Sequence, residues 1–89
     1  MAHSALKVQL RHFIQRTFPL AHQQSNFNDA QSLLSSGIVD SLGVLDLVTY
    51  IEDEFAVVIA DDDLVAENFE SIERMAEFIE AKQSAKILA

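Results

Sequence analysis

Ser41 is the residue whose type and position in the sequence could support chemistry. Gly37 gives the preceding loop backbone freedom. Asp40 is a favourable N-cap, because its carboxylate can accept from the unpaired amides of a first helical turn. Ser41 then takes the first helical position, where its hydroxyl is expected to be exposed near the positive end of the helix dipole. No histidine at a useful spacing, glycine-rich phosphate loop or nucleophile elbow accompanies it. Any modification of this hydroxyl must therefore come from another enzyme.

The helix predicted behind Ser41, ending near Phe55, has two distinct faces. At about 100° per residue, one apolar stripe must pack into a core and consists of Val44, Leu47, Val48, Ile51 and Phe55. The opposite face carries Asp46, Thr49 and Asp53. Leu42 and Leu45 lie outside the core stripe, beside the serine and among carboxylates. Single exposed leucines are common, but two at this place indicate a contact surface.

The sequence pattern around Ser41 extends well beyond a tripeptide. Gly37-Ile38-Val39-Asp40-Ser41-Leu42 is followed by Leu47-Val48 and by Ile51-Glu52-Asp53-Glu54-Phe55, in the middle of an acidic chain of 89 residues. Asp-Ser-Leu alone recurs by chance, whereas the spacing of the downstream residues makes the pattern specific. Over about residues 5–82, the chain resembles the acyl carrier protein and peptidyl carrier protein family. In that family the serine of Asp-Ser-Leu carries a 4′-phosphopantetheine arm, which the resemblance places on Ser41.

The resemblance implies a carrier that other enzymes modify and load, and not an enzyme. A phosphopantetheinyl transferase would use coenzyme A and Mg²⁺, and Ser41 Oγ would attack the coenzyme A pyrophosphate and release adenosine bisphosphate. The arm would provide the thiol that this cysteine-free chain lacks. A loading ligase would attach acyl or aminoacyl groups as thioesters for downstream synthases or transferases. The implied setting is fatty-acid, polyketide, nonribosomal-peptide or related biosynthesis.

The family pattern also implies roles for the residues near Ser41. Asp40 would cap the helix and contribute to transferase recognition. The implied cofactor-binding residues are Ser41, Asp40 and Leu42. The implied partner-binding residues are Leu42, Leu45, Asp46, Thr49, Glu52 and Asp53, with the carboxylates pairing with basic residues of partner enzymes.

Two departures from the family pattern concern the type of carrier. Thr49 stands where fatty-acid carriers often have methionine, and Gly43-Val44 replaces their Asp-rich helix start. The pattern Ser-Leu-Gly-Val-Leu is therefore closer to stand-alone aminoacyl, D-alanyl or peptidyl carriers and to specialised acyl carriers. Gly43 costs a helix up to about 1 kcal/mol relative to alanine, and close approach by the arm or by a partner would account for it.

Charge and composition limit the class of protein. The chain is 49% hydrophobic and short, which predicts a single domain over residues 1–89. Residues 1–28 carry Lys7, Arg11 and Arg16 and no acid, hence +3, whereas residues 29–80 carry all 14 acids and one cation, hence −13. Such a surface disfavours nucleic acid and favours basic protein partners. No signal peptide and no apolar run of the ~20 residues of a membrane span are apparent, so we expect a cytoplasmic monomer.

Helical periodicity extends along most of the chain. A first helix is predicted over about Ala5–Phe18, with a core stripe that includes Thr17, and Pro19 should end it. A long loop follows to Val39, with a possible helical turn at 29–34. A short helix is predicted from Asp61 to about Asn68, with Leu64 and Val65 facing inward, and the apolar run 56–59 should be a buried connector. Ser71 should cap the last helix, which should fray after Lys82. The predicted fold is an all-α, acyl-carrier-like bundle of three long helices and one short helix.

Three other interpretations of the sequence are a calcium-binding loop, a histidine metal site and a different function. As an EF-hand loop, the segment from Asp61 has Ala66 in place of the required glycine and Ile72 in place of the required glutamate, so no calcium site is predicted. His3, His12 and His22 share no ligand spacing and are expected at the surface. The alternative function is an acidic helical interaction module in which Ser41 is never modified.

Overall fold

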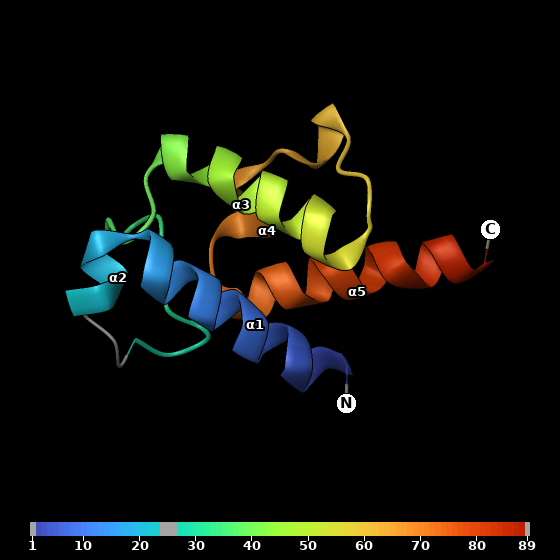
Figure 1. Ribbon diagram of the computed structural model, residues 1–89. Helices are drawn as coiled ribbons and strands as arrows, with labels where there is room; N and C mark the ends of the chain where they lie inside the picture. The colour runs from blue at the N-terminus through green and yellow to red at the C-terminus, as the bar shows by residue number, and fades with distance from the viewer. Residues whose placement is uncertain (1, 24–26, 89) are drawn as a thin grey trace.

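The protein folds into a small bundle of helices (Figure 1). The computed structural model describes residues 2–23 and 27–88, with side chains described over 4–21 and 27–84. Within these ranges there are three long helices and no strand. The long helices are α1 (Ala2–Thr17), α3 (Ser41–Phe55) and α5 (Ile72–Leu88), and the short elements are α2 (Pro19–Gln23), η1 (Asp61–Asp63) and α4 (Ala66–Phe69). The predicted all-α bundle is confirmed.

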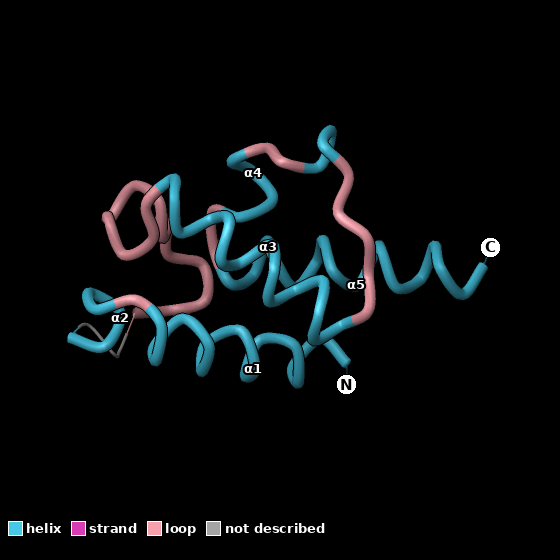
Figure 2. Tube along the Cα trace, turned by 45° about the horizontal axis from the view of Figure 1, so that its top comes forward, coloured by secondary structure: helices cyan, strands magenta, loops and turns pink. Residues whose placement is uncertain are grey.

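The core lies between the three long helices. α1 packs along α5, and α3 lies beside this pair in both views (Figures 1 and 2). Each large apolar side chain buried there stabilises the fold by about 1.5–3 kcal/mol. The fully enclosed residues from these helices are Leu10, Ile14, Leu47, Ile51, Ile72, Met75, Ala76 and Ile79. Among the described helices, none is both long and apolar enough to cross a membrane.

The first helix ends one residue earlier than predicted, and a second helix follows it. α1 ends at Thr17, which is exposed, and the core position falls to Phe18 instead. Pro19 does stop α1, but it also begins α2, because its fixed φ and missing N–H suit a first helical position. The predicted loop from Leu20 therefore begins with a short helix. The possible helical turn at 29–34 is a series of turns and no helix.

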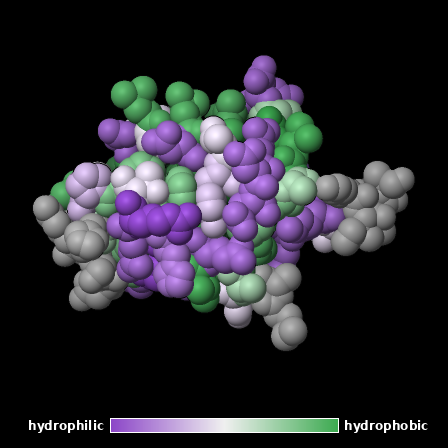
Figure 3. Space-filling model, viewed as in Figure 1, coloured by the Kyte–Doolittle hydropathy of each residue, from purple (hydrophilic) through white to green (hydrophobic). Residues whose placement is uncertain are grey.

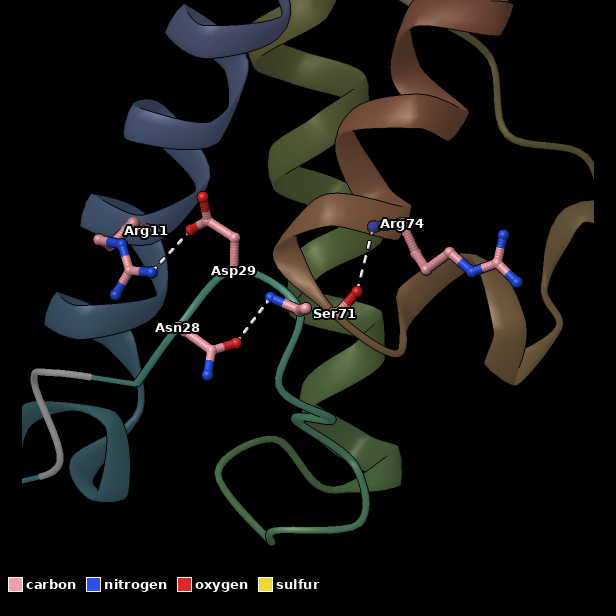
Figure 4. Close-up of polar contacts among 6 residues, drawn as sticks. Arg11, Asn28, Asp29, Ser71 and Arg74 are labelled. Carbon is pink, nitrogen blue, oxygen red and sulfur yellow. Dashed lines mark hydrogen bonds and ion pairs between the residues drawn. The ribbon is translucent and has the colours of Figure 1, made fainter.

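The loop that leads to α3 is fixed by both neighbouring helices. The carboxylate of Asp29 pairs with Arg11 of α1 at 2.7 Å (Figure 4), and the Arg11 guanidinium lies 4.5 Å from the centre of the Phe27 ring. At the other side, the Asp29 carbonyl accepts from the Glu73 amide at 2.9 Å. The Leu33 amide donates to the Glu70 carbonyl at 2.6 Å. The residues before Ser41 are thus held between α1 and the start of α5.

The connector between α3 and α4, residues 56–65, departs most from expectation. α3 ends where Ala56 takes a left-handed conformation with φ 55° and ψ 42°. Only Val57 of the apolar run is fully buried, whereas Val58 faces solvent. The predicted helix from Asp61 to Asn68 is split into η1 and α4. Leu64 and Val65 lie in the break between them and are 44% and 45% exposed, so their predicted inward orientation was wrong.

The last helix begins as predicted and is longer than predicted. Ser71 Oγ accepts from the Arg74 amide at 3.1 Å, which is the expected N-cap (Figure 4). The core stripe of Ile72, Met75, Ala76 and Ile79 is buried, and Phe78 is partly buried against it. Helix α5 continues to Leu88, past the residue after which fraying is predicted.

Candidate functional site

The N-terminus of α3 is capped as the sequence predicted. Asp40 is extended, with φ −94° and ψ 178°, and its Oδ1 accepts from the Gly43 amide at 2.7 Å. Its carbonyl accepts from the Val44 amide at 3.2 Å. The cap satisfies one of the first-turn amides, and the preceding amides have no partner within the helix. Ser41 is therefore the first residue of a well-formed helix end.

Ser41 is exposed, and within the described part of the chain its hydroxyl makes no hydrogen bond. The side chain lies at the positive end of α3, where unpaired amides and the helix dipole favour a negatively charged group. No histidine or carboxylate forms a hydrogen bond with it among the described residues. This environment suits a hydroxyl that accepts an anionic group from an external enzyme.

An apolar hollow of about 230 Å³ lies beside Ser41. None of its lining side chains is charged, and they come from the loop, α3, the connector and α4. The lining residues are Leu34, Ser41, Val44, Leu64, Val65, Ala66 and Phe69. Sequence periodicity missed this hollow, because it placed Leu64 and Val65 in the core instead of on the wall that faces Ser41. A long, flexible group attached to Ser41 would have an apolar surface next to it.

Leu42 and Leu45 are exposed beside Ser41, as the helical spacing predicted. Leu42 is 76% exposed and Leu45 is 59% exposed. Apolar side chains project along the upper edge of the molecule in the view of Figure 3, above the polar face below them. With Leu64 and Val65, these leucines form an apolar surface around Ser41 that has no cover within the described residues.

The polar residues of α3 divide into two groups in the structure. Asp46 and Asp53 are exposed and pair with no cation in the described part of the chain. Glu52 is only partly exposed, and its Oε2 accepts from the Ile59 amide at 2.9 Å. Thr49 Oγ1 is exposed and donates to the Leu45 carbonyl at 3.1 Å. Glu52 thus holds the connector against α3, while Asp46 and Asp53 have their carboxylates directed to solvent.

Gly43 has a structural explanation that the sequence could not supply. A Cβ at Gly43 would lie 2.6 Å from Cε1 of Phe18 and 3.2 Å from Oδ1 of Asp40. Gly43 is buried, and Phe18 follows directly after α1. The missing side chain therefore allows Phe18 to pack under the first turn of α3, in the protein interior and not on the side open to a partner.

The described residues contain no cluster of three or more histidine, cysteine or carboxylate side chains that could hold a metal ion. Asp63 of the aspartate run pairs with Lys82 and accepts from the Ala60 amide. His12 is exposed, whereas the side chains of His3 and His22 lie outside the described residues. Asp63 therefore has structural partners of its own.

Comparison with known proteins gives one informative result. A family model described as a phosphopantetheine attachment site matches residues 5–79, a range that includes most of α1, the loop, Ser41 and the first part of α5. None of the curated proteins compared with the chain matches it.

Proposed function

Because the chain belongs to the phosphopantetheine attachment-site family, we propose that Ser41 bears the 4′-phosphopantetheine arm. We further propose that the protein carries acyl or aminoacyl groups between enzymes. The family is one of carrier domains and not of catalysts. The observation that supports Ser41 most directly is its exposed, unpaired hydroxyl at the capped N-terminus of α3, beside the apolar hollow.

The residues around Ser41 fit the group chemically. Ser41 Oγ attacks the coenzyme A phosphorus that bears pantetheine, the new O–P bond forms a phosphodiester, and the P–O bond to adenosine 3′,5′-bisphosphate breaks. The proton of the hydroxyl passes to the transferase, which also supplies Mg²⁺. The unpaired amides of Ser41 and Leu42 would favour the negative charge of the phosphodiester, as the N-terminus of a helix does. When bound, the group supplies a thiol that holds acyl groups as thioesters, in a chain without cysteine.

The surface around Ser41 supports recognition by partner enzymes. Leu42 and Leu45 offer apolar area, and desolvated apolar anchors contribute most of the affinity of many interfaces. Asp46 and Asp53 offer unpaired negative charge, which accelerates encounter with basic surfaces. Their partners would be a phosphopantetheinyl transferase, an acyl or aminoacyl ligase, and downstream enzymes of fatty-acid, polyketide, nonribosomal-peptide or related biosynthesis. Glu52 contributes less in this proposal, because its carboxylate already holds Ile59.

The carrier function can be tested with a preloaded donor. The protein is incubated with acetyl-coenzyme A, Mg²⁺ and a transferase of broad specificity, and its intact mass is measured before and after neutral hydroxylamine. We expect one acetyl-phosphopantetheine group on the wild type. Hydroxylamine should then remove the acetyl group and leave the arm, because it cleaves thioesters and not phosphodiesters.

The matched variants are Ser41→Ala and Ser36→Ala, the latter an exposed serine of the preceding loop. Ser41→Ala should gain no mass, and Ser36→Ala should behave as the wild type. If folded wild-type protein gained no mass, the carrier function would be rejected, and an acidic docking module with an unmodified serine would become the better explanation.

A further inference from the structure

One wall of the hollow beside Ser41 lies outside the helices of the bundle. Leu64 and Val65 line the hollow from the segment between η1 and α4. In Figures 1 and 2 the connector rises from the end of α3 and returns over it to α4. Because no long helix contains these two residues, their position depends on the contacts of the residues next to them.

Asp63, immediately before Leu64, makes several contacts that fix this segment, and its own amide donates to the Ala60 carbonyl at 2.9 Å. Its Oδ2 accepts from the Ala60 amide at 3.0 Å and pairs with Lys82 Nζ of α5 at 2.5 Å. Its backbone carbonyl accepts from Asn68 Nδ2 at 2.8 Å and from the Val65 amide at 2.9 Å. The connector is therefore tied to α5 directly beside the wall of the hollow.

The carboxylate of Asp63 is held in its charged form. The hydrogen bond from Lys82, and then that from the Ala60 amide, lower the pKa of Asp63 below its ordinary value. The two side chains are 23% and 29% exposed, so water screens this ion pair less than a pair at the open surface. Arg74, on the same helix, forms longer and more exposed pairs with Glu67 and Glu77, at 3.8 Å and 3.7 Å, and among the described residues it forms no ion pair with the connector.

We infer that the Asp63–Lys82 ion pair positions the Leu64–Val65 wall and thereby sets the surface that an enzyme acting on Ser41 must recognise. The functional half of this inference rests on the proposed role of Ser41. Neither Asp63 nor Lys82 is among the residues that line the hollow, so they act through Leu64 and Val65 as positioning residues.

The positioning half is tested on the unmodified protein by hydrogen exchange. Lys82→Met keeps the aliphatic side chain and removes the charge, and Arg74→Met makes the same change on the same helix away from the connector. In Lys82→Met we expect the protected amides of Ala60, Leu64 and Val65 to exchange about two- to fivefold faster. This change in rate corresponds to the loss of the free energy that a partly exposed ion pair contributes. The amides of Leu47 and Ile51 in α3 should keep their wild-type rates.

Arg74→Met should leave the connector amides unchanged, and Lys82→Arg, which retains the charge, should restore wild-type exchange. Unchanged connector amides in Lys82→Met would overturn the inference. An equal increase at all amides would also overturn it, since the ion pair would then contribute only to global stability.

The functional half is tested by the kinetics of phosphopantetheine transfer to Ser41. At a temperature where every variant is fully folded, Lys82→Met should raise KM about threefold and leave kcat unchanged, because recognition changes and the chemistry does not. Lys82→Arg and Arg74→Met should match the wild type. If the wild type were modified and Lys82→Met had the same KM as the wild type, the functional half of the inference would be overturned. An unmodified wild type would instead reject the proposed function of Ser41, while the exchange experiment would still decide whether the ion pair positions the wall.

Discussion

Gly43 is a residue whose missing side chain leaves room for a close contact under the first turn of α3. The Phe18 ring occupies the space that a Cβ at this position would need. A glycine inside a helix costs up to about 1 kcal/mol relative to alanine, and here that cost is offset by burial of Phe18, which is only 8% exposed. The close contact joins the end of α1 to the first turn of α3.

Replacement of Gly43 should therefore destabilise the fold, although alanine is the better helix former. Overpacking of a tight contact costs about 1–3 kcal/mol, so Gly43→Ala should lower the free energy of unfolding by about 1 kcal/mol after its gain in helix propensity. Urea denaturation measures this change. Phe18→Leu should relieve the clash, so the double variant should lose less than the two single losses combined. A Gly43→Ala variant as stable as the wild type would contradict the packing role of Gly43.

The surroundings of a residue were predictable where they depend on its neighbours in the sequence, and not where they depend on distant residues. The Asp40 cap and the exposure of Ser41, Leu42 and Leu45 follow from residues close together in the sequence, and the structure agrees with them. The explanation of Gly43 depends on Phe18, which approaches only after the loop has folded back. The contact of Glu52 with the Ile59 amide likewise depends on the path of the chain after α3.

At the scale of elements, α1 and α3 are joined by an aromatic cluster centred on Tyr50. The Tyr50 ring stacks on Phe13 with centroids 4.0 Å apart and meets Phe55 edge to face at 5.9 Å. Its hydroxyl donates to the Gln9 carbonyl of α1 at 3.3 Å. Burial, followed by the Glu54 carboxylate, raises the pKa of Tyr50, and Arg16 opposes that increase.

Tyr50 is the only tyrosine and the chain has no tryptophan, so its ionisation can be followed by ultraviolet absorbance. We expect the midpoint of the Tyr50 titration to lie above the ordinary value of about 10. Glu54→Gln should lower this midpoint, because the negative charge of Glu54 is one of the causes of the raised pKa. Because the pKa of Tyr50 is higher in the folded state than in the unfolded state, its protonated hydroxyl contributes fully to stability below the unfolded pKa. That contribution is lost as the pH rises through the folded pKa, so stability should fall in this range. A midpoint at or below the ordinary value would contradict the burial of Tyr50.

The elements themselves were predictable where apolar periodicity is long. α1, α3 and α5 each have a core stripe that repeats over several turns, and all three were expected near their observed positions. Short elements were predicted less well. The connector has no repeating stripe, and its course depends on contacts with Lys82 of α5 and Glu52 of α3, which lie outside it. The exposed wall of the hollow was therefore missed.

At the scale of the whole molecule, the two signs of charge are separated. The cations of α1 are partly used within the fold, since Arg11 pairs with Asp29 and Arg16 lies 5.5 Å from the centre of the Phe13 ring. Asp46 and Asp53 remain unpaired on the side of α3 that is open to solvent. In a chain with a net charge of −8, these exposed carboxylates would attract basic partners.

Charge reversal of this surface should slow modification and leave the fold intact. For Asp46→Lys/Asp53→Lys we expect the KM of phosphopantetheine transfer to rise about three- to tenfold at low salt, with a smaller change at high salt. The control, Glu73→Lys/Glu77→Lys on α5, makes the same change in net charge on another helix and should have a much smaller effect. Circular dichroism checks the fold of each variant. Equal kinetics for a folded Asp46→Lys/Asp53→Lys variant and the wild type would exclude docking through these carboxylates.

The most direct test of the central claim is to locate the phosphopantetheine group on the protein. The wild type is incubated with coenzyme A, Mg²⁺ and a transferase of broad specificity, and the peptide that contains Ser41 is fragmented in a mass spectrometer. We predict one phosphopantetheinyl group on Ser41 and none on Ser41→Ala. A folded wild type without the group, or with the group on Ser35 or Ser36 instead, would contradict the account.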